Sequence, residues 1–170
     1  MKIKIIMLVF VLFACVSLLS ESTYEIEDLN FVHNNEKIQG KLIVPLIKKQ
    51  KQNLVIFVHG DGAINYDAYG YYDSLFSKLA KNSIISYSWN KKGVEESQGN
   101  WLNQSMQDRA DELSSLLKML KSNKEFTFNK IIILGFSQAS WPISLFAKDN
   151  KDIDNFIFYY LISFAVFMND

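Results

Sequence analysis

A serine in a short glycine-containing motif is the first residue of this sequence that could do covalent chemistry. Ser137 is the centre of a G-x-S-x-A pattern that runs from Gly135 to Ala139, directly after the apolar run at residues 131–134. A serine hydroxyl becomes an effective nucleophile when its oxygen is exposed, oriented and relieved of its proton. A sharp strand–turn–helix exposes the oxygen, and the residues two positions away must be small because the backbones pass closely there. The pattern therefore predicts a nucleophilic Ser137.

A second glycine-rich turn could stabilise the charge that such a nucleophile creates. The H-G-D-G pattern at residues 59–62 follows a β-branched and aromatic run at residues 54–58. A tetrahedral oxyanion needs preorganised backbone N–H donors, and a His-Gly-x-Gly turn after a buried strand commonly supplies one. We expect the N–H groups of Asp61 and Gln138 to form this oxyanion hole. His59 is expected to hold the loop in place, and Asp61 is also a residue type that simply forms turns.

Strands and helices must bring these two turns together. Apolar residues at helical spacing predict one helix that ends near Asn82, a second that begins at the capping-box pair Ser105 and Asp108, and a third from about 139 to 148. Residue composition predicts strands at residues 24–33, 37–44, 54–58, 84–89, 131–134 and 155–167. The last of these is expected to be buried. Strands that alternate with helices predict an α/β protein with a parallel sheet, helices on both faces, and function at the carboxyl ends of the strands.

In these motifs the sequence resembles the α/β-hydrolase family, and within it the bacterial serine aminopeptidase-like and acyl-CoA thioesterase-like hydrolases. The resemblance covers roughly residues 24–165 and includes the polar loop at 89–101. It implies a mostly parallel eight-stranded sheet with a serine–acid–histidine triad. Members of the family tend to carry an aspartate, a proline or arginine, and a glycine at the positions that Asn90, Lys92 and Glu95 occupy here. That loop therefore departs from the family's turn chemistry.

The triad that the resemblance implies lacks its histidine. In the family the acid and the histidine follow the nucleophile, but the two histidines of this chain, His33 and His59, both precede Ser137. We expect residues 21–170 to form a partial α/β-hydrolase domain, incomplete at its C-terminal side with about six of the eight strands, because of a premature stop, a frameshift or a split gene. Since triad members act as a unit, we expect the activity to be impaired.

Residues 1–20 have the order of a secretory signal peptide: two lysines, an apolar run and then small residues. The run is shorter than the about 20 residues that a membrane-spanning helix needs, so we expect cleavage and export. The segment that ends at Cys15 resembles the lipobox of bacterial lipoproteins, which implies acylation of Cys15 and attachment to a membrane. Ordinary cleavage after Ser17 or Ser20, which would release a secreted protein, is the alternative.

Composition excludes several classes of function. Lys plus Arg and Asp plus Glu number 18 each, so the chain has no overall positive charge to attract nucleic acid. With a single cysteine, no clustered metal ligands and no G-x-G-x-x-G motif, we expect neither a metal nor an organic cofactor.

The expected reaction is hydrolysis of an ester, thioester or small peptide bond through an acyl-Ser137 intermediate, and the expected partner is a small acyl or peptide substrate. The sequence leaves two alternatives open. One is a non-catalytic exported lipoprotein that binds ligands on the same scaffold, and the other is acyl transfer to an acceptor other than water.

Overall fold

The computed structural model describes residues 22–47, 51–125 and 127–159. The predicted signal peptide at residues 1–20 and its Cys15 lie outside the described residues. Within the described residues, every helix is too short or too polar to cross a membrane.

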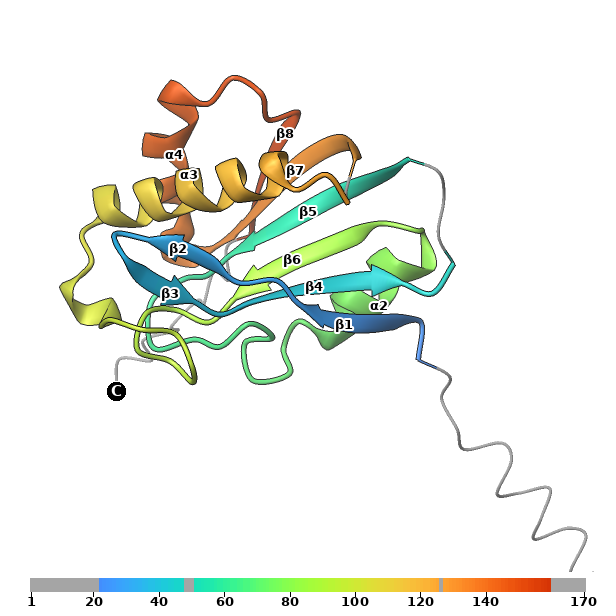
Figure 1. Cartoon of the computed structure of the whole chain (residues 1–170), viewed down its shortest axis with the longest axis horizontal. Helices are drawn as coiled ribbons and strands as arrows, with labels where there is room; N and C mark the ends of the chain where they lie inside the picture. Colours follow the sequence, from blue (N-terminus) through green and yellow to red (C-terminus); the bar gives the residue numbers. More distant parts are fainter. Residues whose placement is uncertain (1–21, 48–50, 126, 160–170) are drawn as a thin grey trace, which may run out of the picture.

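A six-stranded sheet with the order β1-β4-β6-β5-β7-β8 forms the centre of the molecule (Figure 1). Strand β5 pairs in parallel with β6 and β7, and β7 pairs in parallel with β8, whereas β4 is antiparallel to both β1 and β6. The strands are β1 (Tyr24–Asp28), β4 (Gly40–Pro45), β5 (Gln52–Val58), β6 (Ile85–Trp89), β7 (Phe128–Phe136) and β8 (Asn155–Tyr159). The mostly parallel sheet that the sequence predicted is thus confirmed, with six strands.

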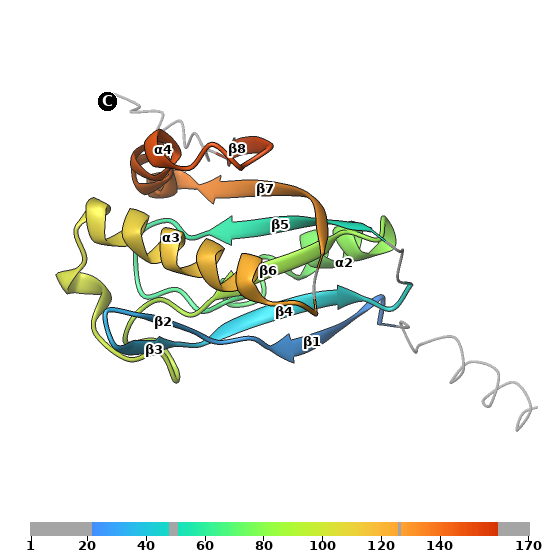
Figure 2. The same cartoon turned by 45° about the horizontal axis from the view of Figure 1, so that its top comes forward.

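Helices cover both faces of this sheet. Helix α2 (Asp73–Lys81) lies on one face, and α3 (Met106–Ser122) and α4 (Ser140–Asp149) lie on the other (Figure 2). Two short 3₁₀ helices, η1 (Trp101–Asn103) and η2 (Ser137–Ala139), precede α3 and α4.

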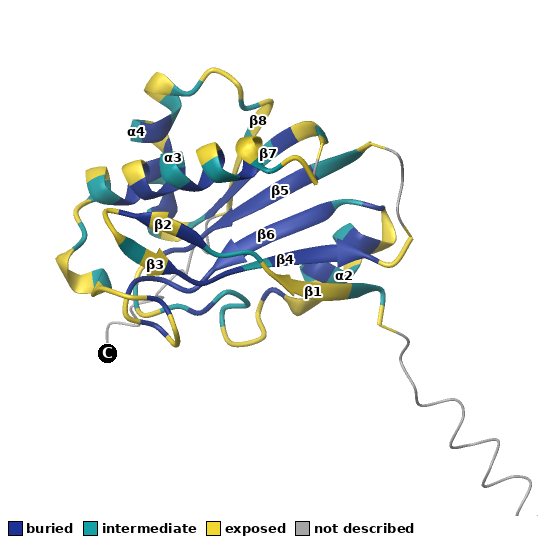
Figure 3. Ribbon diagram, viewed as in Figure 1, coloured by how far each residue is buried: buried dark blue, intermediate teal, exposed yellow. Residues whose placement is uncertain are grey.

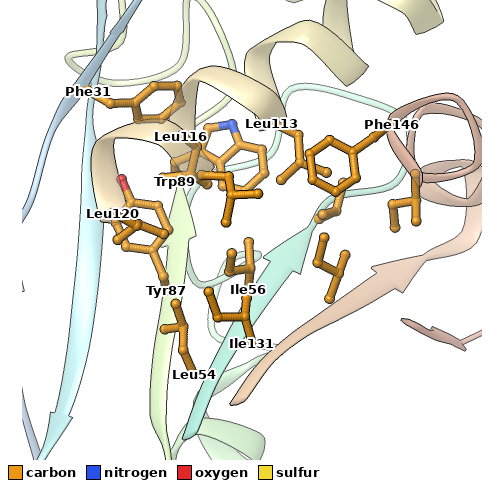
Figure 4. Packing of buried hydrophobic residues seen from close by; sticks show 14 of the residues in the cluster. Phe31, Leu54, Ile56, Tyr87, Trp89, Leu113, Leu116, Leu120, Ile131 and Phe146 are labelled. Carbon is orange, nitrogen blue, oxygen red and sulfur yellow. The ribbon is translucent and has the colours of Figure 1, made fainter. Parts of the chain in front are cut away.

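The alternation of side chains along the strands gives each face its own core. On β5, Ile56 belongs to the cluster beneath α3, whereas Phe57 points to the opposite face and packs with its ring centroid 4.9 Å from that of Phe76 in α2. Figure 4 shows the larger cluster, in which Leu113 and Leu116 of α3 lie over Trp89 and Ile56 of the sheet. The two cores hold the central strands from both sides and fix where their carboxyl ends lie.

The predicted start of α3 is confirmed in detail. Ser105 accepts a hydrogen bond from the backbone N–H of Asp108, and the Asp108 carboxylate accepts one from the backbone N–H of Ser105. This reciprocal pair satisfies two N–H groups that the first turn of a helix otherwise leaves unpaired.

The opening hairpin differs from the expectation of two long strands. Each strand is divided, so that β2 (Phe31–His33) and β3 (Glu36–Ile38) form a separate antiparallel pair across the turn at Asn34 and Asn35. The division follows from Tyr87, whose hydroxyl donates to the carbonyl of Leu29 and occupies the space beside Gly40. The chain therefore leaves the main sheet after β1 and returns to it at β4.

The last strand is less buried than the sequence suggested. Of the stretch predicted at residues 155–167, β8 accounts for residues 155–159, and the remainder lies outside the described residues. Ile157, Phe158 and Tyr159 are exposed because β8 is the edge strand, with β7 as its one neighbour in the described sheet (Figure 3).

The packing of α3 on the sheet can be tested by removing a buried side chain. Leu113 is 0% exposed, so Leu113→Ala should lower the free energy of unfolding by about 2–5 kcal/mol, because it removes apolar contacts and leaves a cavity. Leu102→Ala is the matched control: Leu102 is 69% exposed, and its truncation should change stability by less than about 0.5 kcal/mol. If urea unfolding showed the same loss of unfolding free energy in both variants, this description of the core would be contradicted.

Candidate active site

Ser137 lies in a tight turn between β7 and the helix that follows it. It is the residue directly after Phe136, it is exposed, and its φ of 51° is in the left-handed region that residues other than glycine rarely adopt. The neighbours have the small size that such a turn demands: a Cβ at Gly135 would lie 2.4 Å from the Cδ1 of Ile143 and 3.3 Å from the Cβ of Ala139. The turn therefore has the backbone form of a nucleophile elbow, with the hydroxyl-bearing residue at its exposed tip.

The turn at residues 59–62 lies against this elbow. Strands β5 and β7 are paired neighbours, with Val58 opposite Gly135, so the residues that follow them leave the sheet side by side. A Cβ added to Gly60 would lie 3.1 Å from the carbonyl oxygen of Phe136 and 3.3 Å from the Cβ of Ser137. Such a Cβ contact is tighter than ordinary van der Waals contact, so glycine is what allows this approach.

His59 is buried beneath the turn and holds it. Its Nε2–H donates to the carbonyl oxygen of Trp89 at 2.6 Å, and its Nδ1 lies 3.3 Å from the hydroxyl of Tyr72, which can donate to it. The imidazole also stacks parallel to the Tyr72 ring. Burial lowers the pKa of His59 to about 3, so the ring stays neutral at ordinary pH. Both of its nitrogens have hydrogen-bond partners. His59 therefore has the geometry of a structural residue.

The loop after β6 braces the segment that follows this turn. The side-chain oxygen of Asn90 accepts a hydrogen bond from the backbone N–H of Tyr66 at 2.7 Å. Glu95, at a position where the family tends to have glycine, has a φ of 49°. Its carboxylate accepts hydrogen bonds from the side-chain amides of Asn90 and Asn65, which hold this strained residue in place. Two of the three departures from the family pattern, Asn90 and Glu95, thus belong to one local hydrogen-bond network.

Two buried cations reach the carbonyl groups of the turn. Arg109 of α3 donates to the carbonyl oxygen of His59 at 2.5 Å and to the side-chain oxygen of Gln138 at 2.9 Å, so it joins the two turns. Lys91 donates to the carbonyl oxygen of Gly60 at 3.2 Å. Burial, and then the nearby charge of Arg109, lower the pKa of Lys91 to about 8.

The structure brings the predicted site residues together at one end of the sheet. Asp61 is exposed on its turn, and Gln138 follows Ser137 at the start of η2. Sequence reasoning missed Arg109 and Lys91. The sequence could have indicated that Arg109 is buried, because it lies three residues after Met106 and four before Leu113, on the apolar face of its helix.

Neither histidine of the chain is a base for Ser137 in this structure. His59 is bonded through both nitrogens as described, and His33 places its Nδ1 2.9 Å from the hydroxyl of Ser115 on α3. Burial lowers the pKa of His33 as well. Among residues 22–47, 51–125 and 127–159, no three His, Cys, Asp or Glu side chains gather in a way that could hold a metal ion.

Comparison with solved structures identifies the fold. Over 78% of this chain, an esterase of Pyrococcus furiosus superimposes with a TM-score of 0.63 at 21% identity. Est1E of Butyrivibrio proteoclasticus, solved with ferulic acid bound, matches 75% of the chain with a TM-score of 0.64 at 16% identity. The α/β hydrolase GrgF of a Penicillium species matches 82% with a TM-score of 0.66 at 18% identity.

These likenesses show that the chain has the α/β-hydrolase fold, as its sequence motifs predicted. The chain spans about half the length of these solved structures, with shares of 50%, 50% and 47%. No protein-family model and no curated protein matches the sequence.

The strain at the elbow can be measured by substitution. Ser137→Gly should be more stable than Ser137→Ala by about 1 kcal/mol, because glycine adopts a positive φ without a steric cost. Ser144, inside α4, is the control with the opposite sign: there alanine should be more stable than glycine by about 1 kcal/mol. Urea unfolding gives the stability of all four variants. If the glycine variant were less stable than the alanine variant at both positions, the left-handed turn would be ruled out.

The buried neutral imidazole makes stability depend on pH. In the unfolded chain His59 takes up a proton near its ordinary pKa of 6.5, whereas in the folded chain it stays neutral down to about pH 3. The unfolded state therefore binds more protons in this window, and the free energy of unfolding falls with decreasing pH by up to about 1.4 kcal/mol per pH unit.

A His59→Gln variant should lose this part of the pH dependence and keep the part that belongs to His33. Urea unfolding of both proteins between pH 7 and pH 4 provides the comparison. The same slope in the two proteins would mean that His59 is not buried as a neutral ring.

Proposed function

We propose that this protein is a serine hydrolase of the α/β-hydrolase type, which cleaves ester, thioester or small peptide bonds through an acyl-Ser137 intermediate. The observation that supports this most is the exposed Ser137 at a positive φ, beside a glycine turn at residues 59–62 where a Cβ on Gly60 would crowd it. Strained backbone of this kind persists where the surrounding structure holds it, and it is concentrated at functional sites.

The proposed chemistry begins with attack of the Ser137 hydroxyl oxygen on the carbonyl carbon of the substrate. The carbonyl π bond opens, and its electron pair moves to the oxygen, which becomes an oxyanion between the N–H groups of Asp61 and Gln138. Collapse of this intermediate breaks the bond to the leaving group, which takes a proton from solvent and departs as the alcohol, thiol or amine, and the acyl group stays on Ser137. Water then repeats the sequence and releases the acid. Preorganised donors favour this path because they need no reorganisation when the charge forms.

The proton of Ser137 must pass to a base, and the described residues place no imidazole there. His59 and His33 are committed to other partners, so in this chain we expect the proton to leave to solvent. The oxyanion hole and substrate binding alone retain a residual acceleration of about 10³–10⁴ over water in a studied serine protease that lacks its triad. We therefore expect slow turnover together with measurable covalent labelling.

The similar structures are compatible with an acyl substrate. The Pyrococcus furiosus protein is named an esterase, and Est1E was solved with ferulic acid bound. Because this chain spans about half of those proteins, its own substrate and activity are part of the proposal.

A fluorophosphonate probe tests the proposal, because it reacts with a nucleophilic serine and forms a stable phosphonyl adduct. The folded full-length chain should be labelled at Ser137, and Ser137→Ala should remove the label. Ser144→Ala, at an exposed serine of the following helix, should keep it. Labelling would be located by mass spectrometry of the digested protein.

Absence of Ser137-dependent labelling in folded, monomeric protein would contradict the hydrolase proposal and favour the non-catalytic binding protein. If labelling occurs, activated esters offered together with alcohol or amine acceptors identify the acceptor. Free acid as the main product supports hydrolysis, whereas a new ester or amide would replace hydrolysis by acyl transfer.

A further inference from the structure

We propose that Lys91 is a positioning residue for the oxyanion hole: it holds the carbonyl of Gly60 toward the protein interior, so that the N–H of Asp61 faces Ser137. This inference rests on the proposed function. It assigns a role to a side chain outside both sequence motifs that point to the catalytic site.

Lys91 is a buried cation beside the glycine turn. Its side chain is 4% exposed, although it carries an ammonium group. Its Nζ lies 3.2 Å from the carbonyl oxygen of Gly60 and 4.9 Å from the centre of the Trp101 ring. No carboxylate of the described residues lies within 4 Å of it, so a peptide carbonyl and an aromatic face take the place of an ion pair. Burying a cation in this way is costly, and charge-assisted bonds to a carbonyl compensate in part.

The peptide group between Gly60 and Asp61 has a fixed geometry. The described chain has no cis peptide bond, and in a trans peptide the C=O and the following N–H point in opposite directions. The carbonyl of Gly60 is bonded to the buried Lys91, so the N–H of Asp61 points away from Lys91. No backbone carbonyl in the described part of the chain accepts a hydrogen bond from that N–H. This N–H belongs to the residue after Gly60, and a Cβ at Gly60 would lie 3.3 Å from the Cβ of Ser137, so the donor is part of the turn that lies against the elbow.

Lys91 and Arg109 both donate hydrogen bonds to backbone carbonyls of the turn and of the residues after it. The backbone N–H of Lys91 donates to the carbonyl of Ile64 at 3.0 Å, which fixes the far end of the loop. Arg109 bonds the carbonyl of His59 and the side chain of Gln138, the residue that would supply the second donor. The turn and the residues after it are therefore held at three carbonyls, and the carbonyl of the Gly60–Asp61 peptide is the one that the Lys91 ammonium group binds.

Rates of phosphonylation test this role in the full-length chain. Lys91→Met keeps the length and apolar stem of the side chain but removes the donor. It should lower the second-order rate constant for labelling of Ser137 by a fluorophosphonate at pH 7 by at least about tenfold, because a misplaced donor no longer stabilises the developing charge. Lys91→Arg, which restores a cation, should recover most of the rate.

Lys92→Met is the matched control. Lys92 is adjacent, is 6% exposed, and pairs with Glu36 at 2.6 Å instead of with the turn. This variant should keep a rate within about twofold of the unmodified protein, provided that thermal unfolding shows it folded at the assay temperature. Equal rates for Lys91→Met and the unmodified protein, or equal losses in Lys91→Met and Lys92→Met, would overturn the positioning role.

The pH profile separates positioning from general stability. The ammonium of Lys91 faces Arg109 and Glu112 from α3 and Asp61 from the turn, and its pKa of about 8 means that it loses its charge within the assay range. The arginine variant keeps its charge there. The ratio of its rate to that of the unmodified protein should therefore rise as the pH increases from 7 to 9, and a flat ratio would count against the proposal.

The position of the Asp61 amide gives a readout that does not need reactivity. In ¹⁵N–¹H spectra, Lys91→Met should shift the Asp61 amide resonance, and Lys92→Met should leave it in place. If the unmodified protein is not labelled at all, the hydrolase proposal fails, and this comparison still decides whether Lys91 orients the peptide. An unmoved Asp61 resonance in Lys91→Met would overturn the inference.

Discussion

Parallel strands β5 and β7 end side by side, and the chain leaves them through two turns that touch. The contact is between Gly60 and the Phe136–Ser137 backbone, where a Cβ on Gly60 would lie 3.1 Å from a peptide oxygen. Any side chain at position 60 would push the two turns apart. Ser137 and the turn that carries Asp61 lie close together because glycine has no side chain to separate them.

Such an approach needs rigid support, and the support is polar and buried. Below the turns lie a neutral imidazole at position 59, two cations at 91 and 109, and the Glu112 carboxylate, which accepts hydrogen bonds from Trp89 and Gln104. Burial raises the pKa of Glu112 and lowers that of Lys91, so these groups bear a desolvation cost. Buried hydrogen-bond networks make the part of the core that contains them more rigid. The cost is compatible with a function that depends on the direction of one or two N–H groups.

Local patterns in the sequence were sufficient to predict most of what positions the site. The elbow at Ser137 and the turn at 59–62 depend on residues two or three positions apart, and the capping box at Ser105 is local in the same way. The sheet and its helices followed from periodicity. The family resemblance predicted the α/β-hydrolase fold, and the similar structures bear this out.

What the sequence could not predict depends on distant partners. The bond from Lys91 to Gly60 joins residues 31 positions apart, and that from Arg109 to His59 joins residues 50 positions apart. The division of the opening hairpin depends on Tyr87, and the exposure of β8 depends on its place at the edge of the sheet. Hydropathy reports how apolar a strand is but not how many neighbours it has, so the burial predicted for β8 was wrong in its described part.

The most direct test of this account is a crystal structure of the full-length protein after reaction with a fluorophosphonate. We expect a phosphonyl group on the Ser137 oxygen, with its non-bridging oxygen within about 3 Å of the backbone nitrogens of both Asp61 and Gln138, a usual hydrogen-bond length. An adduct whose oxygen points into solvent, or a Gly60 carbonyl turned toward the adduct, would contradict it.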